Sequence, residues 1–188
     1  GSCFWAAWHS SAEDELSAAR DRTLSQVRRL VGDRSRAIVA VCCDSPASWR
    51  RDKHPSYKAN RPAKDQAAIG ELRLVKERLA ADGLLLWEAE GFEADDVIAT
   101  AARLAELNGM DVLIASADKD LLQLVSHARS VRVISTKTGK VMREEDVKEK
   151  LGVYPSFVRD WLALVGDSSD NVAGVPGVGP KRAADMLN

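Results

Sequence analysis

Four short acidic clusters hold the side chains of this sequence that are best suited to metal binding or catalysis. Their candidate side chains are Asp44, Glu93, Asp95, Asp96, Asp118, Asp120, Asp167 and Asp170. Two carboxylates about 4 Å apart repel by roughly 1 kcal/mol in water and by roughly 4 kcal/mol at an effective dielectric of 20. Several of them gathered in one crevice therefore require cations or must hold protons.

The ligand types indicate which cation these acids would hold. Every candidate donor is an oxygen, and the sequence has no His or Cys pair at metal-ligand spacing, which favours Mg²⁺ or Mn²⁺ over zinc. Carboxylates that hold two such ions about 4 Å apart commonly catalyse phosphodiester hydrolysis. One ion activates the attacking water, and both stabilise charge on the phosphate. We therefore predict a site with two divalent ions.

Each cluster taken alone has a simpler structural explanation. Asp95 and Asp96 would be favoured by the dipole at any helix N-terminus, and Asp118 could cap the short helix that follows it. Asp167 and Asp170 could be ordinary turn residues. For a single cluster we prefer these explanations, but the four clusters together favour metal binding.

The elements that must position these acids alternate between strand and helix patterns. We expect strands at 37–43, 84–87, 111–115 and 130–134 and helices at 13–30, 67–81, 94–108 and 119–125, with a helical pattern after 144. This order predicts an α/β fold with a mainly parallel sheet flanked by helices. Ligands of such sheets bind beyond the carboxyl ends of the strands. Since Asp44, Glu93 and Asp118 follow three of those ends, we expect the acids to converge at one edge.

A basic segment separates the first two acidic clusters. Its only acidic residue is Asp52, and its basic residues are Arg50, Arg51, Lys53, Lys58, Arg61 and Lys64. The net charge of the chain is only −1, so this positive charge is local. A basic rim beside an acidic centre suits a protein that holds a polyanion while it binds metal cations. We expect the stretch around Pro55 and Pro62 to be irregular, and the alternative explanation of its charge is an ordinary solvated loop.

A glycine- and proline-rich segment at 174–181 precedes the last predicted helix. The glycines permit a tight turn, and Pro180 suits a first helical position. Free amides at that helix start can hold a DNA phosphate, with Lys181 and Arg182 adding positive charge. The pattern predicts a helix–hairpin–helix that grips the duplex backbone without selecting a base sequence. The alternative is a plain helix–turn–helix corner.

Composition bounds the class of protein. A chain of 188 residues with 45% hydrophobic residues fits one compact domain with a small appendage. We see no apolar stretch long enough to span a bilayer and no secretory leader. The cysteines are odd in number, three, and Cys42 and Cys43 are adjacent within an apolar run. They therefore predict reduced thiols in a core and a cytoplasmic protein without a membrane partner.

The motifs in this order resemble those of the bacterial and phage 5′-nuclease (flap endonuclease) family, which includes the 5′-3′ exonuclease domain of DNA polymerase I. The matching strings are Glu-Ala-Asp-Asp at 93–96, Ser-Ala-Asp-Lys-Asp at 116–120, Gly-Asp-Ser-Ser-Asp-Asn at 166–171 and the hairpin at 174–181. The resemblance implies a PIN-like nuclease core over 1–150 and the start of a helix–hairpin–helix region over 151–188. It also implies a metal-dependent enzyme that cleaves DNA at 5′ ends, nicks or flaps.

The same resemblance assigns roles to individual residues. It implies an arch-like region at about 49–66, where Lys58 and Arg61 contact the scissile phosphate and Tyr57 stacks on a base. Asp118 joins Lys58 and Arg61 as a catalytic residue. The hairpin residues implied to bind DNA are Gly177, Gly179, Lys181 and Arg182. A K⁺ ion at the hairpin, RNA–DNA primer junctions as substrates and a monomeric state are further expectations.

Two departures from the family pattern keep other functions open. The family begins with a strand ending in a metal-binding Asp, whereas this sequence starts at the segment that normally follows, Gly1 to His9. We therefore expect the first core strand and its ligand to be missing. The sequence also stops at Asn188, within the second helix of the hairpin. The alternatives are a non-catalytic or degenerate DNA-binding paralogue and a ribonuclease that acts on RNA primers.

Overall fold

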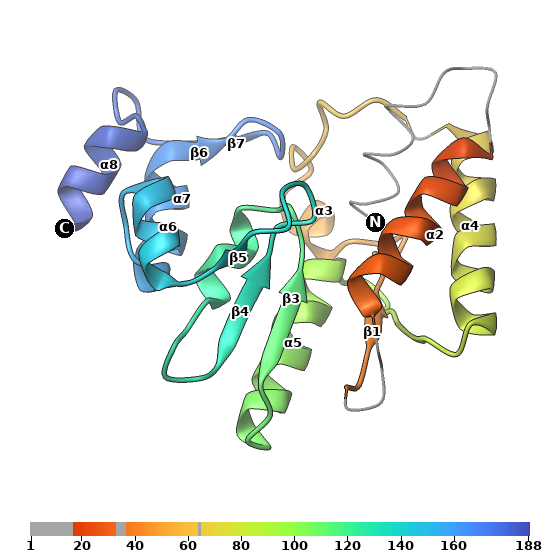
Figure 1. The fold of residues 1–188 in the computed structure, drawn as a ribbon. Coiled ribbons are helices and arrows are strands. Elements are labelled where there is room, and N and C mark those ends of the chain that lie inside the picture. The colour runs from red at the N-terminus through yellow and green to blue at the C-terminus, as the bar shows by residue number, and fades with distance from the viewer. Residues whose placement is uncertain (1–16, 33–36, 64) are drawn as a thin grey trace. The chain divides into compact units, whose positions relative to one another are not determined.

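The computed structural model describes residues 17–32, 37–63 and 65–188 (Figure 1). The expectations for Gly1 to His9, for the beginning of the helix at 13–30 and for Lys64 lie outside these residues. The chain divides into two compact units. The first consists of Gly1–Ala47 and Pro62–Val97, and the second of Ser48–Arg61 and Ile98–Asn188.

The first unit has a small parallel sheet. Strand β1 (Ala40–Cys42) pairs with β2 (Leu85–Trp87), so that Ala40 lies opposite Leu85 and Cys42 opposite Trp87. Val41 and Leu86 pack with the buried residues of the helices, which places an apolar core beside the strands. The parallel pairing confirms the predicted orientation of these two strands.

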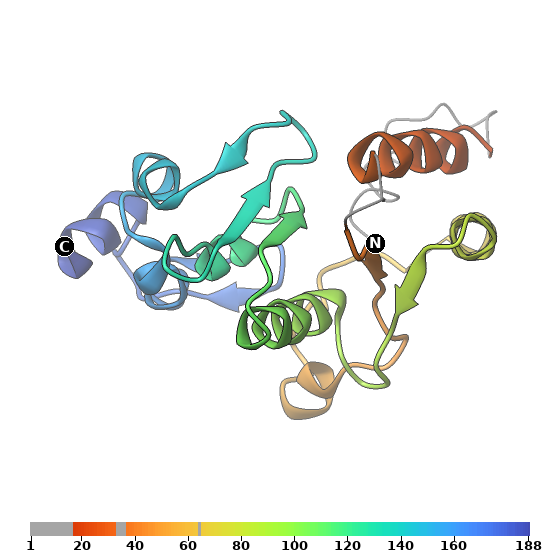
Figure 2. The same cartoon turned by 60° about the horizontal axis from the view of Figure 1, so that its bottom comes forward.

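Two helices of the first unit share this core. Helix α2 (Ala18–Val31) ends at Gly32, whose φ of 53° favours glycine, and α4 (Gln66–Ala81) begins where the Asp65 side chain accepts a hydrogen bond from the Ala67 amide. The two helices lie side by side (Figures 1 and 2). Their buried core residues are Ala19, Leu24, Ala68, Val75 and Leu79.

The second unit is built around a mixed sheet. Strand β3 (Val112–Ala115) pairs in parallel with β4 (Val131–Ile134), and β5 (Val141–Met142) pairs antiparallel with β4. Helix α5 (Ala94–Leu107) begins in the first unit and contributes Ala102 to the core of the second. The mixture of helices with parallel strands confirms the predicted α/β class.

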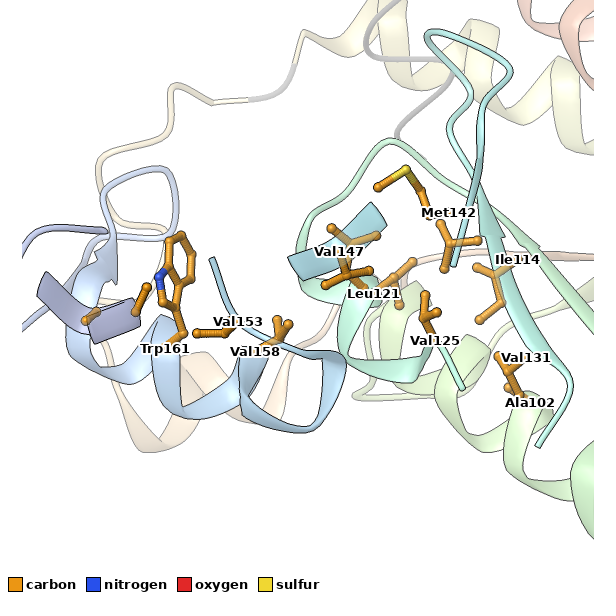
Figure 3. Close-up of a cluster of buried hydrophobic side chains, with 14 residues drawn as sticks. Ala102, Ile114, Leu121, Val125, Val131, Met142, Val147, Val153, Val158 and Trp161 are labelled. Atoms are coloured by element: carbon orange, nitrogen blue, oxygen red, sulfur yellow. The ribbon is translucent and has the colours of Figure 1, made fainter. Parts of the chain in front are cut away.

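Helices and a second hairpin complete this unit. They are η1 (Asp120–Leu124, a 3-10 helix), α6 (Glu144–Leu151), η2 (Pro155–Phe157), α7 (Val158–Val165), β6 (Gly166–Asp167), β7 (Val172–Ala173) and α8 (Pro180–Leu187). Figure 3 shows the buried side chains of this unit. They extend from Ile114 and Val131 on the sheet to Val147, Val158 and Trp161 on the helices. The core therefore continues from the sheet to the C-terminal helices.

Three short elements were not expected from the sequence. Strand β5 and the β6–β7 hairpin have two residues per strand, which is too short for a periodic pattern to reveal. Helix α3 (Trp49–Lys53) lies where the sequence predicted an irregular segment, so that expectation was wrong for these five residues. Residues 55–60 after it form turns, as Pro55 indicates.

The β6–β7 hairpin depends on close backbone contact at Gly174. A Cβ atom built there would collide with the Val165 carbonyl group and the Leu164 oxygen. We expect Gly174→Ala to lower the free energy of unfolding by about 3 kcal/mol, because main-chain atoms cannot move aside cheaply. Gly70→Ala in α4 is the matched control: its Cβ would meet no atom within 4 Å, and it should stabilise the helix by about 0.5–1 kcal/mol. Chemical denaturation of both variants checks this, and equal effects would contradict it.

No helix in the described part of the chain combines the length and the apolar character needed to cross a membrane. The two cysteines that the structure describes, Cys42 and Cys43, are both free thiols.

Candidate metal and nucleic-acid site

The first unit holds its candidate acids on two neighbouring loops. Asp44 follows β1, and its Oδ1 accepts a hydrogen bond from the Ala94 amide at 2.9 Å. The next residue, Ser45, ties these loops together, since its amide donates to the Phe92 carbonyl at 3.1 Å and its Oγ accepts from the Gly91 amide at 3.1 Å. The structure therefore places Asp44 beside the start of α5, where the other acids of this unit lie.

The start of α5 carries Glu93, Asp95 and Asp96. The Asp96 Oδ2 accepts a hydrogen bond from the Glu93 amide at 3.1 Å, so Asp96 helps to cap the helix. Glu93 is only 9% exposed, which is unusual for a carboxylate. The helix-terminus explanation offered for Asp95 and Asp96 therefore fits Asp96, Asp44 also accepts an amide of the helix start, and burial makes Glu93 the least ordinary acid of this unit.

The thiol of Cys42 reports the negative charge around these acids. Burial first, and then the neighbouring Cys43 and the charge of Asp95, raise the pKa of Cys42 to about 11. The Cys42 thiol is therefore protonated at neutral pH, as expected for a packed residue rather than a nucleophile.

In the second unit, Asp118 and Asp120 lie on the turn that follows β3. The Asp118 amide donates to Ser116 Oγ at 3.0 Å, and the Asp118 Oδ1 accepts from the Asp120 amide at 3.0 Å. This contact is the capping role that the sequence left open for Asp118. It uses one carboxylate oxygen, Oδ1.

Asp120 has an environment that suits a bound cation. Burial first, and then the charges of Asp118, Asp167 and Asp170, raise its pKa to about 6 against the opposing charge of Lys119. Its Oδ1 is buried and has no hydrogen-bond partner among the described residues. An unsatisfied buried oxygen among other carboxylates fits a hard divalent ion, so the donor chemistry on this side is compatible with Mg²⁺ or Mn²⁺.

The raised pKa makes Asp120 costly for stability when no metal is bound. Its folded pKa of about 6 exceeds the ordinary value of 3.8, so stability should fall as pH rises from about 4 to about 6. We expect Asp120→Asn to stabilise the metal-free protein at pH 7.5 by about 1–2 kcal/mol, discounted for partial exposure, and to have little effect near pH 4. Denaturation in EDTA at both pH values checks this, and a pH-independent effect would contradict it.

Asp167 has a lowered pKa, in contrast to the raised pKa of Asp120. Burial raises the pKa of its carboxyl, but hydrogen bonds from Ser169 and Lys119 outweigh burial and lower the value to about 2. The Asp167 Oδ1 accepts from the Ser169 amide at 2.8 Å and from its hydroxyl at 2.6 Å, and Lys119 Nζ lies 3.0 Å from Oδ2. Asp167 therefore stays ionised and fixes the turn that carries Asp170.

Asp170 brings together the residues that the sequence singled out in the basic segment. The Tyr57 hydroxyl donates to Oδ2 at 3.0 Å, Lys58 Nζ lies 3.8 Å from Oδ2, and Arg61 donates to Oδ1 at 2.5 Å. The Asp170 side chain is 17% exposed. The second unit thus joins an acid expected to bind metal to three residues expected to bind DNA.

The C-terminal hairpin has the predicted geometry. Gly179 precedes α8 with Pro180 at its first position, and the Trp161 indole fixes this corner by donating to the Pro180 carbonyl at 3.1 Å. Gly177 has a φ of 76°, and a Cβ at either glycine would meet no atom within 4 Å. Lys181 and Arg182 are exposed. The outer surface of the hairpin is therefore open for a ligand.

No three Asp, Glu, His or Cys side chains among residues 17–32, 37–63 and 65–188 are grouped closely enough to form a ready-made metal site. Within each unit the acids are instead held by amides and cations. Sequence reasoning missed two kinds of supporting residue in the second unit: Lys119 and Ser169 bind Asp167, whereas Asn60 and Asn171 donate to main-chain carbonyls. Their only local signal was their position next to the acidic and basic motifs.

Comparisons with known proteins agree with this architecture. The family model described as the 5′-3′ exonuclease N-terminal resolvase-like domain matches residues 4–152, and the model described as the 5′-3′ exonuclease C-terminal SAM fold matches residues 153–188. A protein of bacteriophage T5 co-crystallised with metal ions has a TM-score of 0.78 at 22% identity, covering 99% of this chain and 71% of that one. The T5 flap endonuclease in complex with DNA and metal ions has a TM-score of 0.76 at 22% identity, covering 96% and 70%. These likenesses show the fold.

Curated relatives extend the comparison to sequence. DNA polymerase I of Rhizobium leguminosarum is 48% identical over 150 residues, which is 79% of this chain and 15% of that protein. The 5′-3′ exonuclease of Aquifex aeolicus is 44% identical over 150 residues, 79% of this chain and 51% of that protein. The chain thus spans about half the length of one relative and less of the other. Because a family model matches most of its residues, the chain belongs to the 5′-3′ exonuclease family of bacterial and phage 5′-nucleases.

Proposed function

We propose that this chain provides a metal-dependent, structure-selective 5′-nuclease activity that hydrolyses phosphodiester bonds in DNA at 5′ ends, nicks or flaps. The observation that carries the proposal is the joining of Tyr57, Lys58 and Arg61 to Asp170 within the second unit, close to the unsatisfied carboxylate of Asp120. Phosphodiester hydrolysis needs cations for a phosphate and acids for metal ions. This unit presents both.

We assign the metal ions, two Mg²⁺ or Mn²⁺, to the candidate acids of the sequence, namely Asp44, Glu93, Asp95, Asp96, Asp118, Asp120, Asp167 and Asp170. When bound, such ions lower the pKa of water and stabilise phosphate charge. Asp118 and Asp120 offer oxygens on the turn after β3, while Asp167 holds the neighbouring turn in place.

The basic residues act on the DNA. Arg61 and Lys58 are suited to neutralise the scissile phosphate, and Tyr57 can stack on a base of a single-stranded 5′ end. The hairpin binds the phosphates of the duplex through the free amides at Gly177 and Gly179, with Lys181 and Arg182 adding charge and a K⁺ ion at the turn. A relative of the same fold, the T5 flap endonuclease, was crystallised with DNA and metal ions. We further propose a monomer that acts in the cytoplasm and also accepts RNA–DNA primer junctions.

Cleavage of a labelled 5′-flap duplex tests the proposal. The expected result is cleavage near the junction in Mg²⁺ or Mn²⁺ and none in EDTA. DNA binding without cleavage in either metal would favour the alternative of a non-catalytic binding protein. Cleavage of an RNA flap in preference to a DNA flap of the same sequence would favour a ribonuclease that removes primers.

Gly179→Ala separates DNA binding from folding. The free protein accommodates the added methyl group, because Gly179 has ordinary φ and ψ angles of −86° and 177° and a Cβ built there would meet no atom within 4 Å. A phosphate held by the start of α8 would meet that methyl group, so we expect the Kd for duplex DNA to rise about tenfold. Fluorescence anisotropy measures the Kd, and thermal unfolding should show an unchanged Tm. Unchanged binding would assign the duplex contact to another surface.

A further inference from the structure

Two turns of the second unit are fastened to each other by asparagine side chains. We call residues 56–61 the basic turn and residues 167–171 the acidic turn. The Asn60 Nδ2 donates to the Ser168 carbonyl at 2.8 Å, and the Asn171 Nδ2 donates to the Ser56 carbonyl at 2.8 Å. Each turn thus supplies one carboxamide to the main chain of the other, and we call this reciprocal pair the clasp.

The clasp differs in kind from the contacts at Asp170. Tyr57, Lys58 and Arg61 reach the Asp170 carboxylate, which the proposed function assigns to a metal ion. A cation at that carboxylate would compete with all three. The clasp bonds end on main-chain carbonyl oxygens instead, so they do not depend on the state of Asp170. They can hold the basic turn in place while its cations turn toward a phosphate.

The backbone of both turns shows that they are held by their surroundings. Lys58 and Asn171 have φ angles of 56° and 57°, which lie in the left-handed region that residues other than glycine rarely adopt. Such residues persist where neighbouring contacts fix them. The Lys58 amide donates to the Asp170 carbonyl at 2.9 Å, which places this strained residue at the centre of the clasp.

We propose that Asn60 and Asn171 are positioning residues that hold the basic turn against the acidic turn, so that Lys58 and Arg61 stay beside the proposed metal ligands whether or not a metal ion is bound. The proposal rests on the proposed function for its consequence in cleavage. Neither asparagine touches the substrate in this role. Both act by holding Lys58 and Arg61 in place.

Amide hydrogen exchange of the metal-free protein tests the clasp without any reaction. Asn60→Ala removes one donor, and Asn171→Gly removes the other without opposing its positive φ. Since two hydrogen bonds are lost, the double variant should exchange amides of residues 56–61 at least about tenfold faster than the wild type. Asn108→Ala is the matched control, because Asn108 Nδ2 also donates to a main-chain carbonyl, that of Leu104 at 2.8 Å, outside both turns. Unchanged exchange at 56–61, or an equal rise in Asn108→Ala, would overturn the clasp.

Single-turnover cleavage of a 5′-flap duplex tests the positioning role. The double variant should lose about tenfold in the rate at saturating DNA, with the half-saturating DNA concentration within about twofold of the wild type, because the clasp orders groups rather than adding contacts. Asn60→Gln, which keeps a carboxamide, should retain more of the wild-type rate than Asn60→Ala does. An unchanged saturating rate in a variant with faster exchange would refute the positioning role. Absence of cleavage in the wild type would refute the proposed function, while the exchange result would still decide the clasp.

Discussion

Asp118→Asn is expected to lower cleavage of a 5′-flap duplex by about 1,000-fold or more while leaving the Kd for that DNA within about threefold of the wild type. The substitution keeps the size of the side chain and its ability to accept the hydrogen bond from the Asp120 amide, which Asp118 Oδ1 receives at 3.0 Å. It removes the charge that a divalent ion needs. The turn after β3 should therefore keep its shape and lose its metal.

Asp111→Asn is the matched control for this experiment. Asp111 is exposed and directly precedes β3, at the opposite end of the same strand from Asp118. It should retain wild-type cleavage. The rise in Tm caused by Mg²⁺ gives a second measurement, expected to shrink in Asp118→Asn and to persist in Asp111→Asn. Full cleavage activity in Asp118→Asn would remove the central claim about the metal site.

Arg61→Ala is expected to reduce the single-turnover cleavage rate by about 100-fold, because a guanidinium beside the scissile phosphate stabilises charge that develops during the reaction. Its Nε is held by the Ser169 carbonyl at 3.0 Å and its terminal nitrogen lies 2.5 Å from Asp170, so it is already aimed into the acidic turn. Arg61→Lys should be faster than Arg61→Ala but slower than the wild type, since lysine keeps the charge but cannot form bidentate hydrogen bonds.

Metal affinity distinguishes this effect from the loss of a metal ligand. Removing Arg61 takes a competing cation away from Asp170, so Mg²⁺ binding to Arg61→Ala, measured by calorimetry, should be equal to or tighter than in the wild type. Arg159→Ala is the control. The Arg159 side chain is 81% exposed and lies 3.5 Å from Asp160 in α7, and its removal should change neither cleavage nor metal binding. Weaker Mg²⁺ binding in Arg61→Ala would contradict the proposed role.

Local signals were enough to predict several elements and the chemistry of the acids. The strands at Val41, Leu86 and Ile114 followed from runs of apolar residues, although β1 is shorter than the predicted 37–43, and Gly32 marked the end of α2 because its positive φ favours glycine. The acidic motifs indicated hard metal ions because carboxylate chemistry does not depend on the fold. The positions of Asp44 and Asp118 after strands followed from the same patterns.

Which side chains contact one another became known only from the folded structure. Arg61 and Asp170 are 109 residues apart in sequence, and Asn171 and Ser56 are 115 apart, so no local pattern could pair them. The raised pKa of Asp120 depends first on burial, which also comes only with packing. The small β6–β7 hairpin needed the close backbone approach at Gly174. A sequence fixes the chemistry of each side chain locally, but its partners and its exposure to water are set by chain segments that only folding brings together.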